Sequence, residues 1–236
     1  MNLYIVQHEE CEAPGAFLSW ADRRGYNTIF TRCYLKEKLI DDISNVDMLL
    51  VLGGPQSPDT TLQECPHFDS KAEMDLINKC IQSGKIVIGV CLGAQLMGKA
   101  AGAVHCHSPQ KEVGTVELTL TEEGKKDPYL KDLPASFMAG SWHNDMPGVT
   151  QDSLVLAYSA GCPRQIIKYA PKAYGFQCHL EFTKEVVQLL LRDNGNDISD
   201  ASIKPYVQTA EEILNFDYSQ MNQYLETFLD NIVKDE

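Results

Sequence analysis

The stretch of sequence that decides the fold is Lys85-Ile86-Val87-Ile88-Gly89-Val90-Cys91-Leu92-Gly93-Ala94-Gln95. The apolar β-formers over 86–90 predict a buried strand, and the residues over 92–101 are typical of a helix. Glycine flanks Cys91 on both sides, two positions away. This is the pattern of a nucleophile elbow, with Cys in place of Ser, in which larger flanking side chains would collide. We therefore interpret Cys91 as a nucleophile at a helix N-terminus, where the helix dipole favours the thiolate.

Two other interpretations explain this stretch less well. A cysteine that only packs in the core would not require glycine at both flanking positions. The glycines at 89, 93 and 98 do not fit the dinucleotide pattern G-x-G-x-x-G, and the P-loop pattern G-x-x-x-x-G-K-[ST] is absent. The elbow therefore explains the glycines better than a nucleotide site does.

The composition points away from nucleic acids and membranes. The 236 residues include 20 Lys and Arg against 33 Asp and Glu, for a net charge of −13. Such an acidic chain is a poor partner for phosphate backbones or anionic lipid surfaces. It has no apolar run of transmembrane length, and residues 1–6 lack the basic region of a signal peptide. We therefore expect a cytoplasmic protein that binds neither nucleic acid nor membrane.

The cysteines predict neither a disulfide framework nor a metal centre. The eight Cys include no C-x-x-C pair, and the chain is long for a disulfide-stapled fold. His105-Cys106-His107 resembles a metal-binding cluster, but neighbouring side chains on a strand point to opposite faces. We interpret this segment as a loop or strand edge, and we expect no metal and no cofactor.

The order of the predicted elements indicates an α/β fold. Strands are predicted over 2–7, 26–32 and 46–52, and helices over 16–24 and 68–82. This order predicts a mostly parallel central sheet flanked by helices. Shorter strand segments predict a small added antiparallel sheet, and they lie over 113–120, 136–139, 154–159, 165–169 and 173–178.

Two further segments carry candidate catalytic groups. Gly53-Gly54-Pro55 follows the strand over 46–52, at the sheet edge where open α/β folds bind ligands. An exposed N–H of that loop would stabilise an oxyanion, although an ordinary turn has the same composition. Later in the chain a predicted strand ends at His179, and Glu181 follows two residues on. A thiol nucleophile needs a base and the base needs an orienting acid, so His179 and Glu181 are candidates for these roles.

A polar, aromatic loop is predicted at Ser141-Trp142-His143-Asn144-Asp145. Such loops often line binding sites, and a surface turn is an equally good interpretation. His143 is a rival base, but Asp145 is the one carboxylate close enough in sequence to orient it, and no strand is predicted to hold it. We therefore favour His179 as the base.

The tail of the chain contains a predicted amphipathic helix. Its apolar residues are spaced at i, i+3, i+4, i+7, i+8 and i+11, and they are Met221, Tyr224, Leu225, Phe228, Leu229 and Ile232. Docking of this helix on the α/β domain is favoured over binding of a partner. We therefore expect a domain over 1–192 and a helical extension over 193–236 packed on it.

Together these segments resemble the class I glutamine amidotransferase family. The resemblance covers about residues 1–192 and rests on Gly53-Gly54-Pro55, Gly89-Val90-Cys91-Leu92-Gly93-Ala94-Gln95 and Gly175-Phe176-Gln177-Cys178-His179-Leu180-Glu181. Lys111-Glu112-Val113-Gly114 and Trp142-His143-Asn144-Asp145 are most similar to the amidotransferase domain of GMP synthase. Leu180 stands where the family commonly has Pro. The resemblance implies the family's flavodoxin-like fold.

The resemblance also implies roles for individual residues. Cys91 would be the nucleophile, His179 the base and Glu181 its orienting acid. The oxyanion N–H groups would come from Gly54 and Leu92. The substrate would contact Gly53, Gln95, Ser141, Trp142 and His143.

The activity implied by the family is hydrolysis of glutamine through a Cys91 thioester. Ammonia and glutamate would be released, and a separate synthetase subunit would accept the ammonia, because only a helical tail follows residue 192. Two alternatives stay open. One is hydrolysis of a γ-glutamyl peptide such as a glutathione derivative, which releases an amino compound in place of ammonia. The other is a regulatory subunit that binds glutamine without turnover, which the intact Cys91, His179 and Glu181 disfavour.

Overall fold

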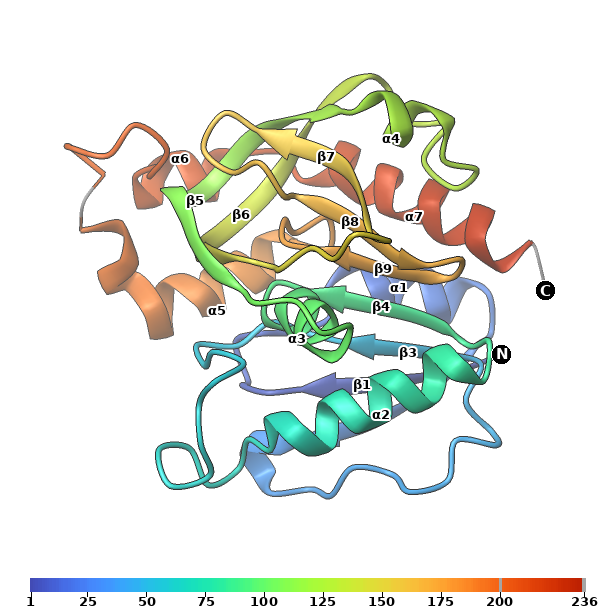
Figure 1. Ribbon diagram of the computed structural model, residues 1–236. Helices are drawn as coiled ribbons and strands as arrows, with labels where there is room; N and C mark the ends of the chain where they lie inside the picture. The colour runs from blue at the N-terminus through green and yellow to red at the C-terminus, as the bar shows by residue number, and fades with distance from the viewer. Residues whose placement is uncertain (200, 235–236) are drawn as a thin grey trace.

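The computed structural model describes residues 1–199 and 201–234, which form a nine-stranded sheet with helices on both faces (Figure 1). The strand order is β2-β1-β3-β4-β9-β8-β7-β5-β6. Five neighbouring strands run parallel, namely β2 (Asn27–Arg32), β1 (Asn2–Gln7), β3 (Met48–Val51), β4 (Ile86–Val90) and β9 (Ala173–Phe176). The remaining strands pair antiparallel, and they are β8 (Ile166–Ala170), β7 (Leu154–Ser159), β5 (Cys106–Leu120) and β6 (Ser136–Met146). The predicted α/β fold is confirmed, and its antiparallel strands continue the central sheet.

The parallel strands are apolar along their whole length because both of their faces are buried. In β1, Leu3 and Ile5 belong to the apolar core on one face, whereas Tyr4 and Val6 belong to the core on the other. Successive side chains of a strand point to opposite faces, so a strand covered on both sides needs a continuous apolar run. This is the reason that the sequence pattern over 86–90 predicted the central strand β4 correctly.

Helices cover both faces of the sheet. On one face lie α2 (Ser70–Gln82) and α3 (Leu92–Ala100), and on the other lie α1 (Ala16–Arg23) and α7 (Ser219–Val233), as Figure 1 shows. The shorter helices are η1 (Cys33–Leu35), α4 (Glu122–Lys126), α5 (Lys184–Asn194), η2 (Gly195–Ile198) and α6 (Ala210–Asn215).

The predicted amphipathic helix near the end of the chain is α7, and it docks on the sheet through its apolar stripe. Met221, Leu225 and Phe228 are buried in the same core as the side chains of α1. At the polar margin of that contact, the indole N–H of Trp20 donates a hydrogen bond of 3.0 Å to the carboxylate of Asp230. The helix therefore closes one face of the sheet.

The prediction that residues 141–145 form a loop is wrong, because these residues lie within β6. The strand pairs antiparallel with β5, and the register places Val113 opposite Trp142 and Glu112 opposite His143. The apolar alternation that marks β5 covers only residues 113–120, but the strand begins at Cys106. The polar ends of both strands pair with one another, which an apolar pattern in a single segment cannot reveal.

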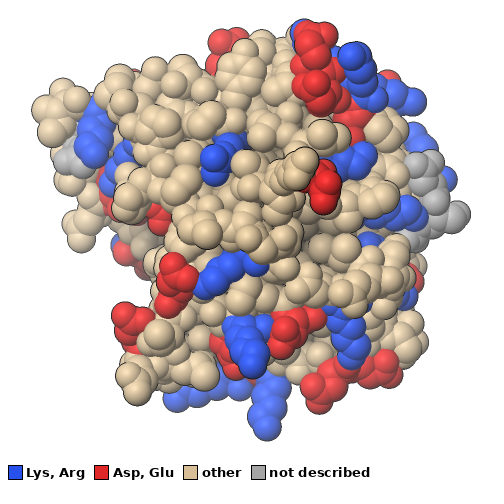
Figure 2. Space-filling model, viewed as in Figure 1, with Lys and Arg blue, Asp and Glu red and all other residues tan. Residues whose placement is uncertain are grey.

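The surface carries charges of both signs. On the face shown in Figure 2, Lys and Arg side chains are interspersed with Asp and Glu. Among the described residues, none of the helices combines the length and the apolar character needed to cross a bilayer.

Candidate active site

Cys91 lies at the turn between β4 and α3, in the strained backbone conformation that an elbow requires. Its φ is +50°, a value that side-chain-bearing residues rarely adopt. The two flanking glycines make the turn sterically feasible. A Cβ on Gly89 would lie 2.5 Å from the backbone of Gly93, and a Cβ on Gly93 would lie 2.0 Å from the carbonyl oxygen of Val51. The sterics that predicted the elbow are thus present in the fold.

The Cys91 thiol is placed at the N-terminus of α3 and faces a cavity. The backbone N–H of Cys91 donates a hydrogen bond of 2.7 Å to the carbonyl of Phe176, which connects the turn to the end of β9. The sulfur lies 3.9 Å from the carbonyl oxygen of Trp142. The positive end of the α3 helix dipole points at this position.

His179 and Glu181 form a buried pair beyond the end of β9. The Nδ1 atom of His179 is 2.6 Å from Oε1 of Glu181, and the imidazole stacks on the ring of Phe182 at a centroid distance of 4.2 Å. A carboxylate only accepts, so Nδ1 carries the hydrogen and donates it. The other ring nitrogen, Nε2, is buried without a hydrogen-bond partner in the described part of the chain.

The pKa of His179 lies well above its ordinary value of 6.5. Burial acts to lower the pKa, but the Glu181 carboxylate and the Cys91 side chain together outweigh burial. Cys91 lines the cavity, whereas His179 and Glu181 are buried as a hydrogen-bonded pair that does not line it. The electrostatic influence of Cys91 on His179 indicates that these two predicted residues are neighbours.

Three contacts hold the segment that carries this pair. His179 exchanges two backbone hydrogen bonds of 2.8 Å with Gly140 of β6. The carbonyl of Glu181 accepts from the N–H of Ala16 at the start of α1, at 2.9 Å. From α7, the amide of Asn222 donates to the carbonyls of Leu180 and Phe182 at 2.8 and 2.9 Å. The described tail thus fixes the backbone on both sides of Glu181.

The cavity in front of Cys91 has a volume of about 600 Å³. Its walls come from the loop after β3, from β5 and β6, and from the segment after α5. The lining includes five of the predicted site residues, which are Gly54, Cys91, Gln95, Trp142 and His143. It also includes charged residues to which the sequence analysis gave no role, namely Glu12, Lys111, Asp145, Asp197 and Lys204.

Three other predicted site residues, Gly53, Leu92 and Ser141, do not line the cavity. Gly53 precedes Gly54 in the loop, and a Cβ on Gly53 would lie 3.4 Å from the Cβ of Cys91. Leu92 is the first residue of α3, so its N–H has no acceptor within the helix. Ser141 is fully buried, and its hydroxyl donates to the carbonyl of Glu112 at 3.3 Å. The side chain of Ser141 therefore contacts the strand pair and not the cavity.

His143 has a carboxylate partner that the sequence analysis missed. Its Nε2 is 3.1 Å from Oε2 of Glu112, the residue directly opposite on β5. The argument that only Asp145 lies near enough to orient His143 is therefore wrong, since pairing across strands brings in Glu112. Asp145 instead pairs with His107. The Lys111-Glu112 motif was a signal for this contact, but its position opposite His143 depended on the register of β5 and β6.

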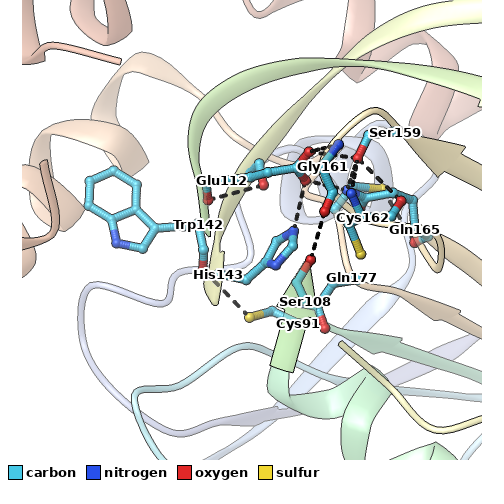
Figure 3. Close-up of polar contacts among 12 residues, drawn as sticks. Cys91, Ser108, Glu112, Trp142, His143, Ser159, Gly161, Cys162, Gln165 and Gln177 are labelled. Atoms are coloured by element: carbon cyan, nitrogen blue, oxygen red, sulfur yellow. Dashed lines mark hydrogen bonds and ion pairs between the residues drawn. The ribbon is translucent and has the colours of Figure 1, made fainter. Parts of the chain in front are cut away.

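Glu112 sits in a closed network of donors (Figure 3). Its carboxylate accepts from the Ser159 hydroxyl at 2.6 Å, the Gly161 N–H at 3.1 Å and the Gln165 amide at 2.7 Å, besides His143. In Figure 3 the imidazole of His143 lies between this network and Cys91. Because the carboxylate is surrounded by donors, Nε2 of His143 carries a hydrogen, and Nδ1 is left without a partner among the described residues. His143 therefore presents a polar atom beside the cavity.

A family model described as glutamine amidotransferase class-I matches residues 20–195. The chain belongs to this family. Over 232 residues it is 47% identical to the glutamine amidotransferase-like protein YfeJ of Salmonella typhimurium, and the match covers 98% of this chain and 97% of YfeJ. A crystal structure of SMU.1228c has 52% sequence identity and a TM-score of 0.97, over 99% of this chain and 100% of that one.

Similarity to GMP synthase is more limited. One subunit of the glutamine-hydrolysing GMP synthase of Methanococcus maripaludis is 35% identical over 106 residues, which are 44% of this chain and 54% of that protein. The resemblance to the amidotransferase family is therefore confirmed over most of the chain, and its GMP synthase branch is a partial likeness.

Part of the cavity wall lies beyond the residues that the family model matches. Asp197 follows α5, and its carboxylate accepts from the indole N–H of Trp142 at 2.8 Å. The ammonium group of Lys111 donates to the Asp197 carbonyl at 2.7 Å. The segment after α5 thereby contacts β5 and β6 at the wall of this cavity. Sequence analysis missed Asp197 because nothing in the local pattern of a short polar turn indicates its distant partners.

Proposed function

We propose that this class I amidotransferase chain hydrolyses a γ-glutamyl amide, with glutamine as the leading substrate, through a thioester on Cys91. The observation that carries the proposal is the combination of a thiol at the N-terminus of α3 and a His179 whose Nδ1 is held by Glu181 while Nε2 has no other partner among the described residues. These are the parts of a nucleophile, base and orienting acid.

In the acylation step, the Cys91 sulfur attacks the side-chain carbonyl carbon of the substrate as a thiolate, its proton having already passed to Nε2 of His179. The carbonyl oxygen becomes an oxyanion, to which the N–H groups of Gly54 and Leu92 donate. The C–N bond then breaks as His179 returns the proton to the leaving nitrogen, so that ammonia departs and the glutamyl thioester remains. Glu181 stabilises the imidazolium that forms between these events.

In the deacylation step, water attacks the thioester carbonyl and gives a proton to His179. The C–S bond breaks, glutamate is released, and the proton restores the Cys91–His179 pair. We further propose that Gln95, Trp142 and His143 contact the substrate, since all three line the cavity beside Cys91. A separate synthetase subunit would consume the ammonia, and residues 193–236 would act as an extension of a domain over 1–192.

The test is a comparison of Cys91→Ala with the unaltered chain. The unaltered chain is expected to release glutamate and ammonia from glutamine and to gain a covalent adduct at residue 91 from a glutamine-like electrophile, detected by mass spectrometry. The Cys91→Ala variant should show neither. Cys106→Ala is a matched control, because Cys106 is exposed at the start of β5 and should leave both results intact. Turnover in Cys91→Ala at the wild-type rate would refute the assignment.

A second candidate substrate, a γ-glutamyl peptide, is favoured by the size of the cavity. A volume of about 600 Å³ lies within the range of pockets that hold drug-sized ligands. Its lining continues from Cys91 to Asp197 and Lys204, well past the space that an amide nitrogen alone needs. Release of an amino compound from a γ-glutamyl peptide faster than ammonia from glutamine would select this substrate. A stable glutamine complex without product would instead indicate a binding subunit.

A further inference from the structure

Besides the His179–Glu181 and His143–Glu112 pairs, a third buried histidine–carboxylate pair lies next to the loop that contains Gly54. His8 follows β1, Glu73 lies in the first turn of α2, and Gly53 follows β3, so three elements meet at this point. His8 and Glu73 are 0% and 1% exposed. Nδ1 of His8 is 2.8 Å from the carbonyl oxygen of Gly53, and Nε2 is 2.8 Å from Oε2 of Glu73. Both ring nitrogens are therefore engaged, unlike those of His179.

The chemistry of the partners fixes where the protons are. A carbonyl oxygen only accepts, so Nδ1 of His8 must carry a hydrogen and donate it to Gly53. The carboxylate on the other side favours a second proton on Nε2. Burial acts to lower the pKa of His8, but Glu73, the Gly53 carbonyl and Glu12 together outweigh burial, and the pKa is raised. His8 is therefore an imidazolium that donates on one side to an anion and on the other to a backbone carbonyl.

The carbonyl that His8 contacts belongs to the same peptide unit as the N–H of Gly54. The amide is planar, so fixing the direction of its C=O also fixes the direction of its N–H. A charge-assisted hydrogen bond to the carbonyl pulls electron density from the nitrogen and strengthens the N–H as a donor. Gly54 lines the cavity beside Cys91. The charge of the His8–Glu73 pair thus acts on the group that would face the oxyanion.

The loop has little room to take another position. A Cβ on Gly54 would lie 3.1 Å from the Cβ of His8 and 2.9 Å from Leu92 on α3. On the opposite side, a Cβ on Gly53 would lie 2.4 Å from the carboxylate of Glu12. The peptide is therefore enclosed between the buried pair and the nucleophile turn.

We propose that His8, held by Glu73, is a positioning residue that orients and polarises the Gly53–Gly54 peptide as an oxyanion donor. The assignment rests on the proposed function, since it concerns the tetrahedral intermediate of that reaction. His8 does not touch the substrate and acts only through the peptide unit. Its effect should appear in the rate of the chemical step and not in substrate affinity.

Metal binding is the alternative use of this cluster. Ligand atoms of His8, Cys33 and Glu73 lie within 4.8 Å of one another. Within residues 1–199 and 201–234, this is the group of side chains close enough together to hold a metal ion. Yet Nδ1 of His8 already donates to Gly53 and Nε2 to Glu73, so neither nitrogen offers a lone pair. Burial also raises the pKa of the Cys33 thiol to about 12, which opposes the thiolate that a metal needs. A structural hydrogen-bonded pair fits these residues better.

The test compares two double variants, because removing His8 alone would leave a buried unpaired carboxylate. His8→Ala/Glu73→Gln removes the donor and both charges. His8→Asn/Glu73→Gln removes the charges but places an amide N–H near the position of Nδ1. Expected kcat values on glutamine are lower than wild type by about 10- to 100-fold for the first and about tenfold or less for the second, with KM within about threefold. His105→Asn is the control, since its carboxylate partner Asp59 is exposed on the surface.

Alkylation of Cys91 by iodoacetamide separates this role from a general disturbance of the elbow, because that reaction forms no oxyanion. The alkylation rate of both double variants should stay within about twofold of wild type. Unchanged kcat in His8→Ala/Glu73→Gln, or a fall in alkylation equal to the fall in kcat, would overturn the assignment, as would one tightly bound zinc ion per chain. If that variant does not fold, Glu73→Gln alone carries the test, with an expected loss of about three- to tenfold in kcat. An unaltered chain inactive on every γ-glutamyl amide would instead remove the proposed function, and this assignment with it.

Discussion

Two of the buried histidine–carboxylate pairs, His179–Glu181 and His8–Glu73, differ in what the second ring nitrogen of the histidine does. The nitrogen–oxygen separations are similar, 2.6 Å for His179–Glu181 and 2.8 Å for His8–Glu73, and all four side chains are buried. The second ring nitrogen of His179, Nε2, has no hydrogen-bond partner among the described residues, whereas that of His8, Nδ1, donates to the Gly53 carbonyl. A pair of this kind therefore serves proton transfer only where one nitrogen stays open. Where both are engaged, it serves as a fixed charge.

Substitution of each histidine by asparagine should give the largest difference in activity between the two pairs. In His179→Asn the base is lost, and we expect kcat on a γ-glutamyl amide to fall about 10⁴-fold, as for other triads. His8→Asn/Glu73→Gln, with its much smaller expected loss, is the comparison. Glutamate release in the steady state measures both. Losses of equal size would show that the open nitrogen of His179 has no special role.

Glutamine substitutions of the two carboxylates should give a smaller but still clear difference. In Glu181→Gln the imidazolium loses its anion, so we expect kcat to fall about 100-fold or more, against about tenfold or less for Glu73→Gln. The alkaline limb of the pH–rate profile should also move to lower pH. The charged groups that face His179 are Glu181, Glu12 and Cys91, and Glu181 is the main cause of its raised pKa. An alkaline limb that stays in place would contradict this account of proton delivery.

Substitution of Asn222 on α7 tests whether this helix supports the His179–Glu181 pair through one specific contact. Its amide holds the carbonyls of Leu180 and Phe182, so Asn222→Ala should loosen the backbone around Glu181. We expect about a three- to tenfold loss in kcat and about 1–3 kcal/mol of stability. Asn231→Ala is the matched control, because Asn231 lies on the same helix and donates to Tyr129 and Asp132 instead. A similar loss of kcat in that control would assign the effect to α7 as a whole.

The smallest expected effect is on the pH dependence of stability. Both histidines have a raised pKa in the folded chain, so each contributes stability that is fully present below about pH 6.5, the unfolded value, and is lost as pH rises through the folded value. Urea unfolding from pH 6 to 9 should therefore show a decline in the free energy of unfolding. His8→Asn/Glu73→Gln should reduce the decline by on the order of 1 kcal/mol. Identical profiles for the variant and the wild type would exclude a charged His8.

The parts of the site that could be predicted from sequence depend on local geometry. A Cβ on Gly89 would collide with Gly93 within the turn, and a Cβ on Gly93 would collide with Val51 of the neighbouring strand β3. The Gly-x-Cys-x-Gly spacing that follows from these collisions is visible in a few consecutive residues. His179 and Glu181 are two residues apart and meet across a short bend. Resemblance to the amidotransferases added the loop at Gly54. The family and the fold class follow from these short-range signals.

The parts that could not be predicted depend on strand register and on long-range docking. Glu112 reaches His143 only because β5 pairs with β6 at one register, and a shift by one residue would turn the carboxylate to the other face. The error over residues 141–145 has the same origin. Asp197 and Asn222 reach the site from the tail, and no local pattern in that tail refers to Trp142 or Leu180.

By itself, the sequence determined the turn at Cys91 and the central strand over 86–90 that leads into it. Steric exclusion and apolar periodicity act between near neighbours in the chain, so both features are visible in a short segment. Only the tertiary structure decided which nitrogen of each histidine is open, since that depends on the groups that distant elements bring to it. His8 has Gly53 and Glu73 as partners 45 and 65 residues away, and Nε2 of His179 has no hydrogen-bond partner within the described part of the chain. Hydrogen bonding is directional and short in range, so such assignments exist only once the strands and helices have packed.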